Sequence, residues 1–109
     1  MIKIGSVHFP QELSDQVAEC FTSLPLLPKE VRLKETYVYN EDDKEVRAFS
    51  IFEYEEAHEK IAVEFLEARY RSFSKIPGLT YSIENWLRVA DALEIIGTGD
   101  FNPKFSLNA

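Results

Sequence analysis

The chain has few of the residues that mark specialised proteins. It contains a single cysteine, Cys20, among 109 residues, so it cannot form an internal disulfide. Cys20 falls in an apolar series at helical spacing, which predicts a packed thiol. Basic residues are also scarce, because twelve of them face nineteen acidic residues and the net charge is −7. This charge disfavours nucleic acid as a partner.

Long apolar runs are missing as well. No stretch approaches the ~20 residues that a membrane-spanning helix needs. The opening sequence, residues 1–10, has neither a sustained apolar region nor a small-residue cleavage site. We therefore expect a cytoplasmic protein without a membrane partner.

Motifs for metals and phosphates are incomplete. The spacing H-E-x-x-H begins at His58, but Ala62 stands where the second histidine belongs. Glu55 and His58 form one E-x-x-H, whereas a di-iron site needs a second copy. Gly97 and Gly99 follow a predicted helix instead of opening one, so they form no phosphate loop. We therefore predict no metal and no cofactor.

The residues that are present indicate a folded domain. The chain is 45% hydrophobic and 28% charged, and it has one tryptophan, five tyrosines and eight phenylalanines. Alternating patterns predict strands over residues 2–9, 31–40, 45–54 and 79–86, and helical spacing predicts helices over residues 10–24, 55–74 and 87–96. This order is the ferredoxin-like βαββαβ arrangement, an α+β fold with two helices on one face of a four-stranded antiparallel sheet and a short C-terminal helix added. We assign residues 1–97 to the domain and residues 98–109 to a C-terminal tail.

The face of the sheet away from the two helices should be polar in a monomer. Period-two counting places one apolar set under the helices: Ile2, Ile4, Val31, Leu33, Ala48, Phe52, Leu79, Tyr81 and Ile83. The alternate set holds Lys3 and Trp86 together with a cluster of apolar residues: Val7, Phe9, Val38, Phe49 and Ile51. An apolar cluster of this kind marks an interface, so these five residues are predicted to form a homodimer contact.

The run FSIFEYEEAHEKIAVEFL, residues 49–66, ends a strand in aromatic and acidic residues and continues into a helix with an early alanine. It resembles the corresponding segment of the dimeric α+β barrel superfamily, and the element order resembles that superfamily over about residues 1–96. The superfamily includes stress-responsive barrel proteins, antibiotic-biosynthesis-type monooxygenases and haem-degrading enzymes. The resemblance implies a homodimer and a pocket between sheet and helices. It implies no particular reaction, because the superfamily carries several chemistries.

RNA-recognition motifs share this topology and offer an alternative. The run RAFSIFEY, residues 47–54, aligns with their octapeptide, with Arg47, Phe49 and Tyr54 matching. Ile51 replaces one of the aromatic residues on which bases stack, and Lys3 stands where the first strand needs another. Together with the negative charge, these departures make RNA binding the weakest interpretation.

His58 is the candidate catalytic residue. At about 100° per residue it falls within the apolar arc of the predicted helix 55–74, and so does Arg69. The topology gathers Glu53, Tyr54 and Trp86 around His58 as candidate ligand-binding residues. A histidine in such a pocket is suited to act as a general base on a small carbonyl or phenolic substrate.

Two classes of function remain open at this point. The first is binding of a small apolar or aromatic molecule, with cofactor-free oxygenase or isomerase chemistry at His58. The second is a non-catalytic interaction module, in which His58 is a hydrogen-bonded residue at a helix start. The other histidine, His8, should lie at the opposite end of the sheet, so the two histidines are not expected to cooperate.

Overall fold

The computed structural model describes residues 1–42 and 44–97. Its strands are β1 (Ile2–Pro10), β2 (Arg32–Glu41), β3 (Glu45–Glu53) and β4 (Thr80–Trp86). Its helices are α1 (Ser14–Thr22), α2 (Glu59–Arg71) and α3 (Val89–Gly97). Three short 3-10 helices, η1 (Gln11–Leu13), η2 (Glu56–His58) and η3 (Ser72–Lys75), extend α1 and α2. The predicted tail, residues 98–109, lies outside the described residues.

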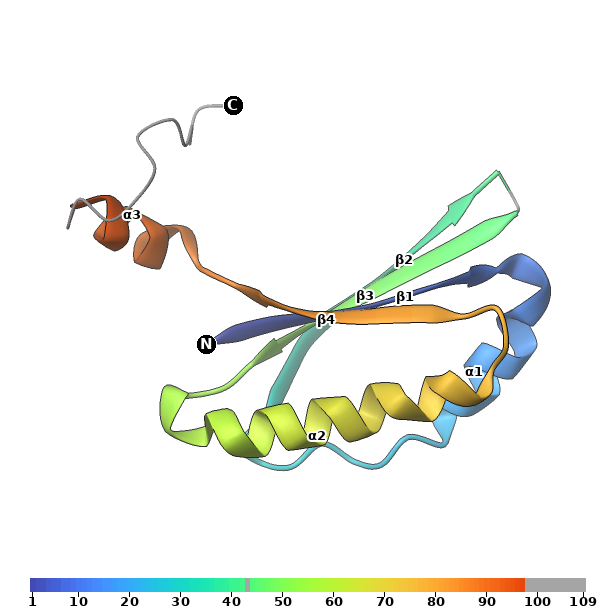
Figure 1. Ribbon diagram of the computed structural model, residues 1–109, viewed down its shortest axis with the longest axis horizontal. Helices are drawn as coiled ribbons and strands as arrows, with labels where there is room; N and C mark the ends of the chain where they lie inside the picture. Colours follow the sequence, from blue (N-terminus) through green and yellow to red (C-terminus); the bar gives the residue numbers. More distant parts are fainter. Residues whose placement is uncertain (43, 98–109) are drawn as a thin grey trace.

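The four strands form one antiparallel sheet in the order β2-β3-β1-β4. Both α1 and α2 lie against the same face of this sheet, and α3 lies beyond the end of β4, away from them (Figure 1). The predicted α+β class and the element order are therefore confirmed, and the strand order is consistent with a ferredoxin-like arrangement. Within the described residues, no helix has the length and apolar character to cross a membrane.

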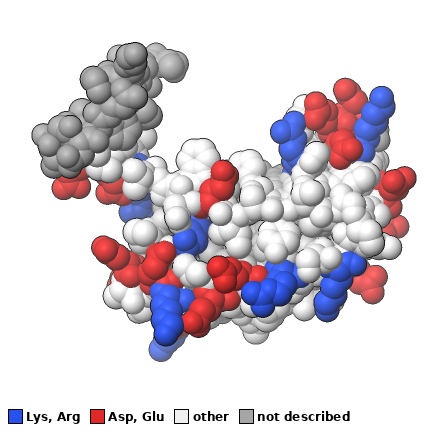
Figure 2. All heavy atoms as spheres, viewed as in Figure 1, with Lys and Arg blue, Asp and Glu red and all other residues white. Residues whose placement is uncertain are grey.

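The outer surface of α2 carries charges of both signs. Acidic Glu56 and Glu59 stand at the start of this helical segment, and exposed Arg71 lies in its last turn, an order that the helix dipole favours. Acidic and basic side chains alternate along α2 and gather again at the tip of the β2–β3 hairpin (Figure 2). The opposite side of α2 provides Ala62 and Leu66 to the core.

The core lies between the sheet and these two helices. Phe52 of β3 and Leu66 of α2 are fully buried, and the ring of Tyr70 packs edge-on against Phe52 with 6.3 Å between centroids. Tyr70 also lies directly over Gly5 in the middle of β1, where a Cβ atom would sit 2.2 Å from its hydroxyl oxygen. The missing side chain at Gly5 is therefore what lets Tyr70 approach the sheet. Cys20 is partly buried against this core, as predicted.

The predicted orientation of β1 is wrong. Lys3, Gly5, Val7 and Phe9 are buried on the helix face, and Ile2 and Ile4 lie on the opposite face. The charge of Lys3 made the odd-numbered set look solvent-facing. In the structure its Nζ donates a hydrogen bond to Asn85 and lies 3.5 Å from the Glu59 carboxylate. These partners allow a lysine to be buried.

The predicted orientation of Val38 is wrong for a different reason. The register between β2 and β3 shifts at Leu33/Glu35, so Lys34 is an extra residue, a β-bulge. The alternation of the strand changes parity there. After the bulge, Val38 pairs with Ala48 and faces the helices, whereas counting from Leu33 had placed it on the other side.

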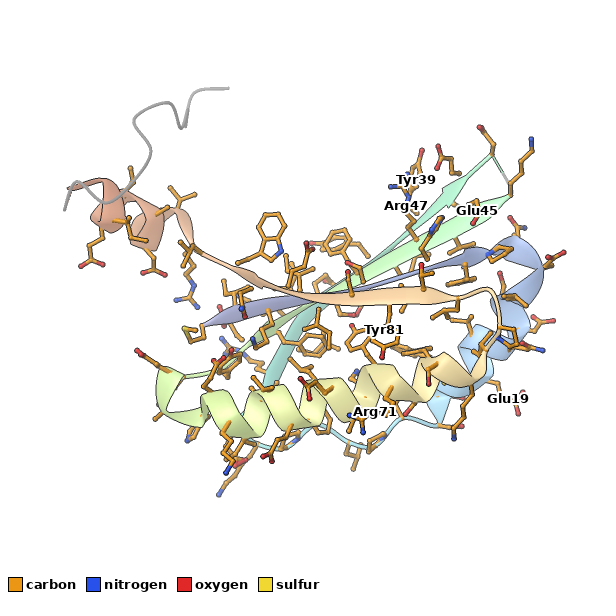
Figure 3. All side chains as sticks on the ribbon, viewed as in Figure 1. Glu19, Tyr39, Glu45, Arg47, Arg71 and Tyr81 are labelled. Carbon is orange, nitrogen blue, oxygen red and sulfur yellow. The ribbon has the colours of Figure 1, made fainter. Side chains whose placement is uncertain are left out.

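We call the face of the sheet away from α1 and α2 the open face. Of the five predicted interface residues, Phe49 and Ile51 lie there, and Val7, Phe9 and Val38 do not. Tyr39 and Arg47 also project from the open face, with the guanidinium 5.8 Å from the ring centroid, whereas Tyr81 projects toward the helices (Figure 3). The apolar and aromatic residues of the open face include Ile2, Ile4, Tyr37, Tyr39, Phe49, Ile51 and Trp86.

Candidate ligand-binding cavity

A cavity of about 570 Å³ lies between the helix face of the sheet and α1. It exists because α1 has only nine residues and α2 packs toward β4, where Tyr70 contacts Tyr81 with 6.1 Å between centroids. The two helices therefore leave the underside of β2 uncovered. Val38 is 69% exposed although it faces the helix side, and it lines the mouth of this cavity.

The walls of the cavity are mainly apolar. They include six residues from the sheet, α1 and η3: Val7, Phe9, Val17, Phe21, Val46 and Phe73. Neutral polar residues also line the cavity: Ser14, Thr22, Thr36, Asn40, Ser50 and Tyr70. The Thr36 and Ser50 hydroxyl oxygens lie 2.7 Å apart and bond to each other, and the hydroxyls of Ser14 and Thr22 donate to backbone carbonyls of Gln11 and Glu19. The volume falls within the range of about 300–1,000 Å³ that small-molecule sites occupy.

Arg69 provides the charge in this cavity. Its side chain comes from the last turn of α2, and the residue is only 7% exposed. Its guanidinium lies 5.7 Å from the ring centroids of both Phe21 and Phe52. Within residues 1–42 and 44–97 it has no hydrogen-bond acceptor and no acidic partner. Burial lowers the pKa of Arg69, but a guanidinium stays protonated in proteins.

Tyr70 follows Arg69 and forms part of the same wall. Burial raises the pKa of its phenol, so the side chain is neutral at physiological pH. Its position depends on Gly5, as described above. The cavity therefore combines a neutral apolar lining with one buried cation.

The predicted site around His58 lies elsewhere, in a surface depression of about 510 Å³. Glu53, Tyr54 and His58 all line it, as the topology predicted. Trp86 lines a separate, smaller depression, which shares Met1 and Arg88 with the first. The depression is lined mostly by charged residues, including Lys29, Glu30, Arg32, Glu55 and Arg88. The apolar surroundings expected for His58 are therefore absent among the described residues.

Glu53 is the centre of this charged depression. Arg32 and Arg88 each donate a hydrogen bond to its carboxylate, and Lys34 Nζ lies 3.6 Å from it. These hydrogen bonds, from Arg32 first, lower the pKa of Glu53 from 4.5 to about 2. Glu53 is thus a buried carboxylate whose charge is already neutralised by the protein.

Tyr54 and His58 make hydrogen bonds to different partners within the protein. The Tyr54 hydroxyl donates a hydrogen bond to Glu59, and burial together with this contact raises the pKa of Tyr54. The same hydrogen bond, helped by the charge of Lys3, lowers the pKa of Glu59. The His58 backbone N–H donates to the Glu55 carbonyl at 2.8 Å, and its Nδ1 is buried without a partner among the described residues. His58 as a catalytic base stays a prediction.

The two histidines are far apart, as predicted. His8 lies near the other end of the sheet, where its Nε2 is 3.1 Å from Glu45. Among the described residues, no group of three or more potential metal-ligating His, Cys, Asp or Glu side chains is found.

The resemblance led us to expect a pocket between sheet and helices, but the sequence did not predict that Arg69 lines it. One signal for it was present, because Arg69 falls in the apolar arc of its helix, where a charge is unexpected. Comparisons with protein-family models, curated proteins and solved structures gave no match. The function therefore has to be inferred from the side chains of these two sites.

Proposed function

We propose that the protein binds a small apolar molecule in the cavity between the sheet and α1, and that it is a homodimer of the dimeric α+β barrel type. The observation that carries the binding proposal is the cavity itself, about 570 Å³ with mainly apolar walls. Its position between sheet and helices is where the resemblance to that superfamily leads us to expect a pocket.

Physical cost supports a ligand at this position. Burying apolar surface stabilises a protein by about 25 cal/mol for each Å² removed from water, and exposed apolar surface lacks this contribution. Val38 in particular is a β-branched side chain left mostly exposed at the cavity mouth. An apolar ligand would remove these walls from contact with water, which the short α1 does not do.

The proposal is for binding and is not extended to catalysis. The candidate base predicted from the sequence, His58, lines the charged depression and does not line the cavity. Oxygenase or isomerase chemistry at His58 would need a substrate in that depression, among charged side chains. The cavity by contrast offers apolar walls and one cation.

Fluorescence of the neutral probe N-phenylnaphthylamine tests the binding proposal, because its emission rises in apolar surroundings. We expect saturable binding that Ala18→Trp abolishes, since Ala18 lines the cavity from α1 and is exposed enough to accept the larger ring. The matched control is Ala68→Trp on α2, which is also exposed and does not line the cavity. Absence of saturable binding, or equal binding by both variants, contradicts the proposal.

A separate observation favours assembly through the open face. Tyr37, Phe49 and Trp86 all expose large aromatic surface there, and Tyr37 packs beside Phe49 with 5.2 Å between centroids. Aromatic residues are enriched at protein interfaces because they bury much area for little lost freedom. This face is also the contact that the non-catalytic interaction module would use.

Sedimentation at micromolar concentration tests the homodimer, for which we expect twice the 12.6 kDa of one chain. Phe49→Asp should produce monomers, because it places a charge in a desolvated surface. Ile61→Asp is the matched control, since Ile61 lies on α2, does not line the cavity and is 42% exposed where Phe49 is 41% exposed. A wild-type protein that sediments as one chain refutes the dimer.

A further inference from the structure

We propose that the ligand of the cavity is an apolar monocarboxylic acid, whose carboxylate pairs with Arg69 while its hydrocarbon body lies against the apolar walls. This inference rests on the proposed binding function and specifies the chemical class of the ligand. It is carried by the contrast between Arg69 and the other buried charges of the protein.

Arg69 differs from Lys3 and Glu53, the other charged residues that are buried among the described residues. Lys3 has Asn85 and Glu59 as partners, and Glu53 has two arginines and a lysine. Arg69 has neither an acceptor nor an acidic partner within the described residues. A buried charge without a partner is costly, so it indicates a counter-charge that arrives from outside.

Its two aromatic neighbours do not meet this need. The faces of Phe21 and Phe52 attract a guanidinium, but they accept no conventional hydrogen bonds. A guanidinium carries five N–H donors in a planar fork that matches the two oxygens of a carboxylate. The two rings hold the guanidinium within the cavity wall and leave its donors unused.

The rest of the lining selects for a single negative charge on an apolar body. No acidic residue lines the cavity among the described residues, although the chain as a whole carries a net charge of −7. The polar groups of the lining other than Arg69 are neutral: Ser14, Thr22, Thr36, Asn40, Ser50 and Tyr70. Thr36 and Ser50 share one hydrogen bond. A bound molecule therefore meets one cation, no repelling carboxylate and mainly hydrocarbon, which is the environment that an apolar acid requires.

Titration calorimetry with decanoic acid and 1-decanol at pH 7.5 tests the inference on the unmodified protein. The two probes share the same chain and differ in the head group. We expect the ionised acid to bind at least tenfold more tightly than the alcohol, because hydrogen bonds to charged groups contribute more than neutral ones. Equal affinities, or tighter binding of the alcohol, overturn the inference without any variant.

Arg69→Met then assigns the effect to its residue, because methionine keeps an unbranched apolar stem without the charge. The affinity for decanoate should fall roughly ten- to a hundredfold, and that for decanol should not fall. Arg71→Met is the control, since Arg71 is exposed on the same helix (Figure 3). Arg69→Lys should retain part of the preference for the acid. A preference that survives Arg69→Met overturns the role of Arg69.

The two proposals fail in distinguishable ways. If neither decanol nor N-phenylnaphthylamine binds in a manner that Ala18→Trp abolishes, the cavity does not bind apolar molecules and both proposals fall. If these neutral probes bind and decanoate binds no better than decanol, the binding function stands and the carboxylate is overturned.

Discussion

Glu53 and Arg69 are both buried charged residues, and their surroundings are opposite. Glu53 lies at the end of β3 among Arg32, Lys34 and Arg88, which supply more positive charge than its carboxylate needs. Arg69 lies at the end of α2 between two phenylalanine rings, with no acidic group against it in the described chain. Both sites border hollows of similar volume, about 510 and 570 Å³.

The presence or absence of partners in the protein separates a structural charge from one that is available to pair with a ligand. The Glu53 network is complete, so it holds β2, β3 and the chain after β4 together and has little to gain from a ligand. The Arg69 site is incomplete, so a ligand carboxylate would supply what the protein lacks. Burial alone therefore does not identify a functional charge; the absence of a partner is the informative observation.

The largest expected effect on stability comes from a substitution that disturbs the wall of the Arg69 cavity. Gly5→Ala places a methyl group 2.2 Å from the Tyr70 hydroxyl, so the ring has to move. We expect a loss of about 3 kcal/mol in the free energy of unfolding, the upper end for overpacking, and weaker probe binding. Urea denaturation measures the loss, with Ser6→Ala on the open face as the control. A Gly5→Ala protein as stable as the Ser6→Ala protein would contradict the packing described here.

The next prediction removes the charge of Glu53 and so disrupts its ion-pair network. The pKa of Glu53 lies at about 2 in the folded protein against 4.5 ordinarily, so its contribution to stability is present above about pH 4.5 and lost as the pH falls to about 2. Glu53→Gln should lower the urea midpoint at pH 7 and flatten its fall across this window. Glu84→Gln, at an exposed carboxylate of β4, should leave the slope as in the wild type. If the urea midpoints of wild type and Glu53→Gln depend on pH in the same way, the ion-pair network of Glu53 is not maintained in solution.

A smaller change in stability is expected at Arg69, and it should stabilise the free protein instead of destabilising it. Arg69→Met should raise the free energy of unfolding by roughly 1 kcal/mol, because an unpaired buried charge is replaced by an apolar side chain. Saturation with decanoate should reverse the order, since a ligand at 100 times its Kd stabilises the wild type by about 2.7 kcal/mol. Thermal unfolding of both proteins, with and without decanoate, measures this reversal in their order of stability. If Arg69→Met destabilises the free protein, the contacts of Arg69 with Phe21 and Phe52 outweigh the cost of its unpaired charge, and the comparison fails.

The smallest effect is expected at His58. His58→Ala should leave the affinity of the cavity for N-phenylnaphthylamine and decanoate unchanged, because His58 lines the charged depression instead. Fluorescence and calorimetry on a folded variant measure this. A marked fall in affinity would return His58 to the binding site and favour the site predicted from the sequence.

The order of elements was predictable because alternation and helical spacing are local properties, and they are strong in this chain. The faces of the strands were not all predictable. Lys3 reads as solvent-facing unless Asn85 and Glu59 are known to be near it, and both are distant in sequence. A pocket between sheet and helices was expected from the resemblance, but its position beneath β2 was not, because that position depends on how far α1 extends. Arg69 was visible as a charge in an apolar arc, but the rings that hold it come from α1 and β3.

The β-bulge at Lys34 makes the length of β2 independent of the surfaces that the strand builds. Leu33 pairs with Phe52 and Glu35 pairs with Ile51, so Lys34 is the extra residue. Deleting Lys34 would remove the bulge and leave every later residue opposite its present partner on β3. Thr36 and Val38 would stay on the cavity side, and Tyr37 and Tyr39 would stay on the open face. The strand can therefore lose one residue at this position during divergence without exchanging its two faces.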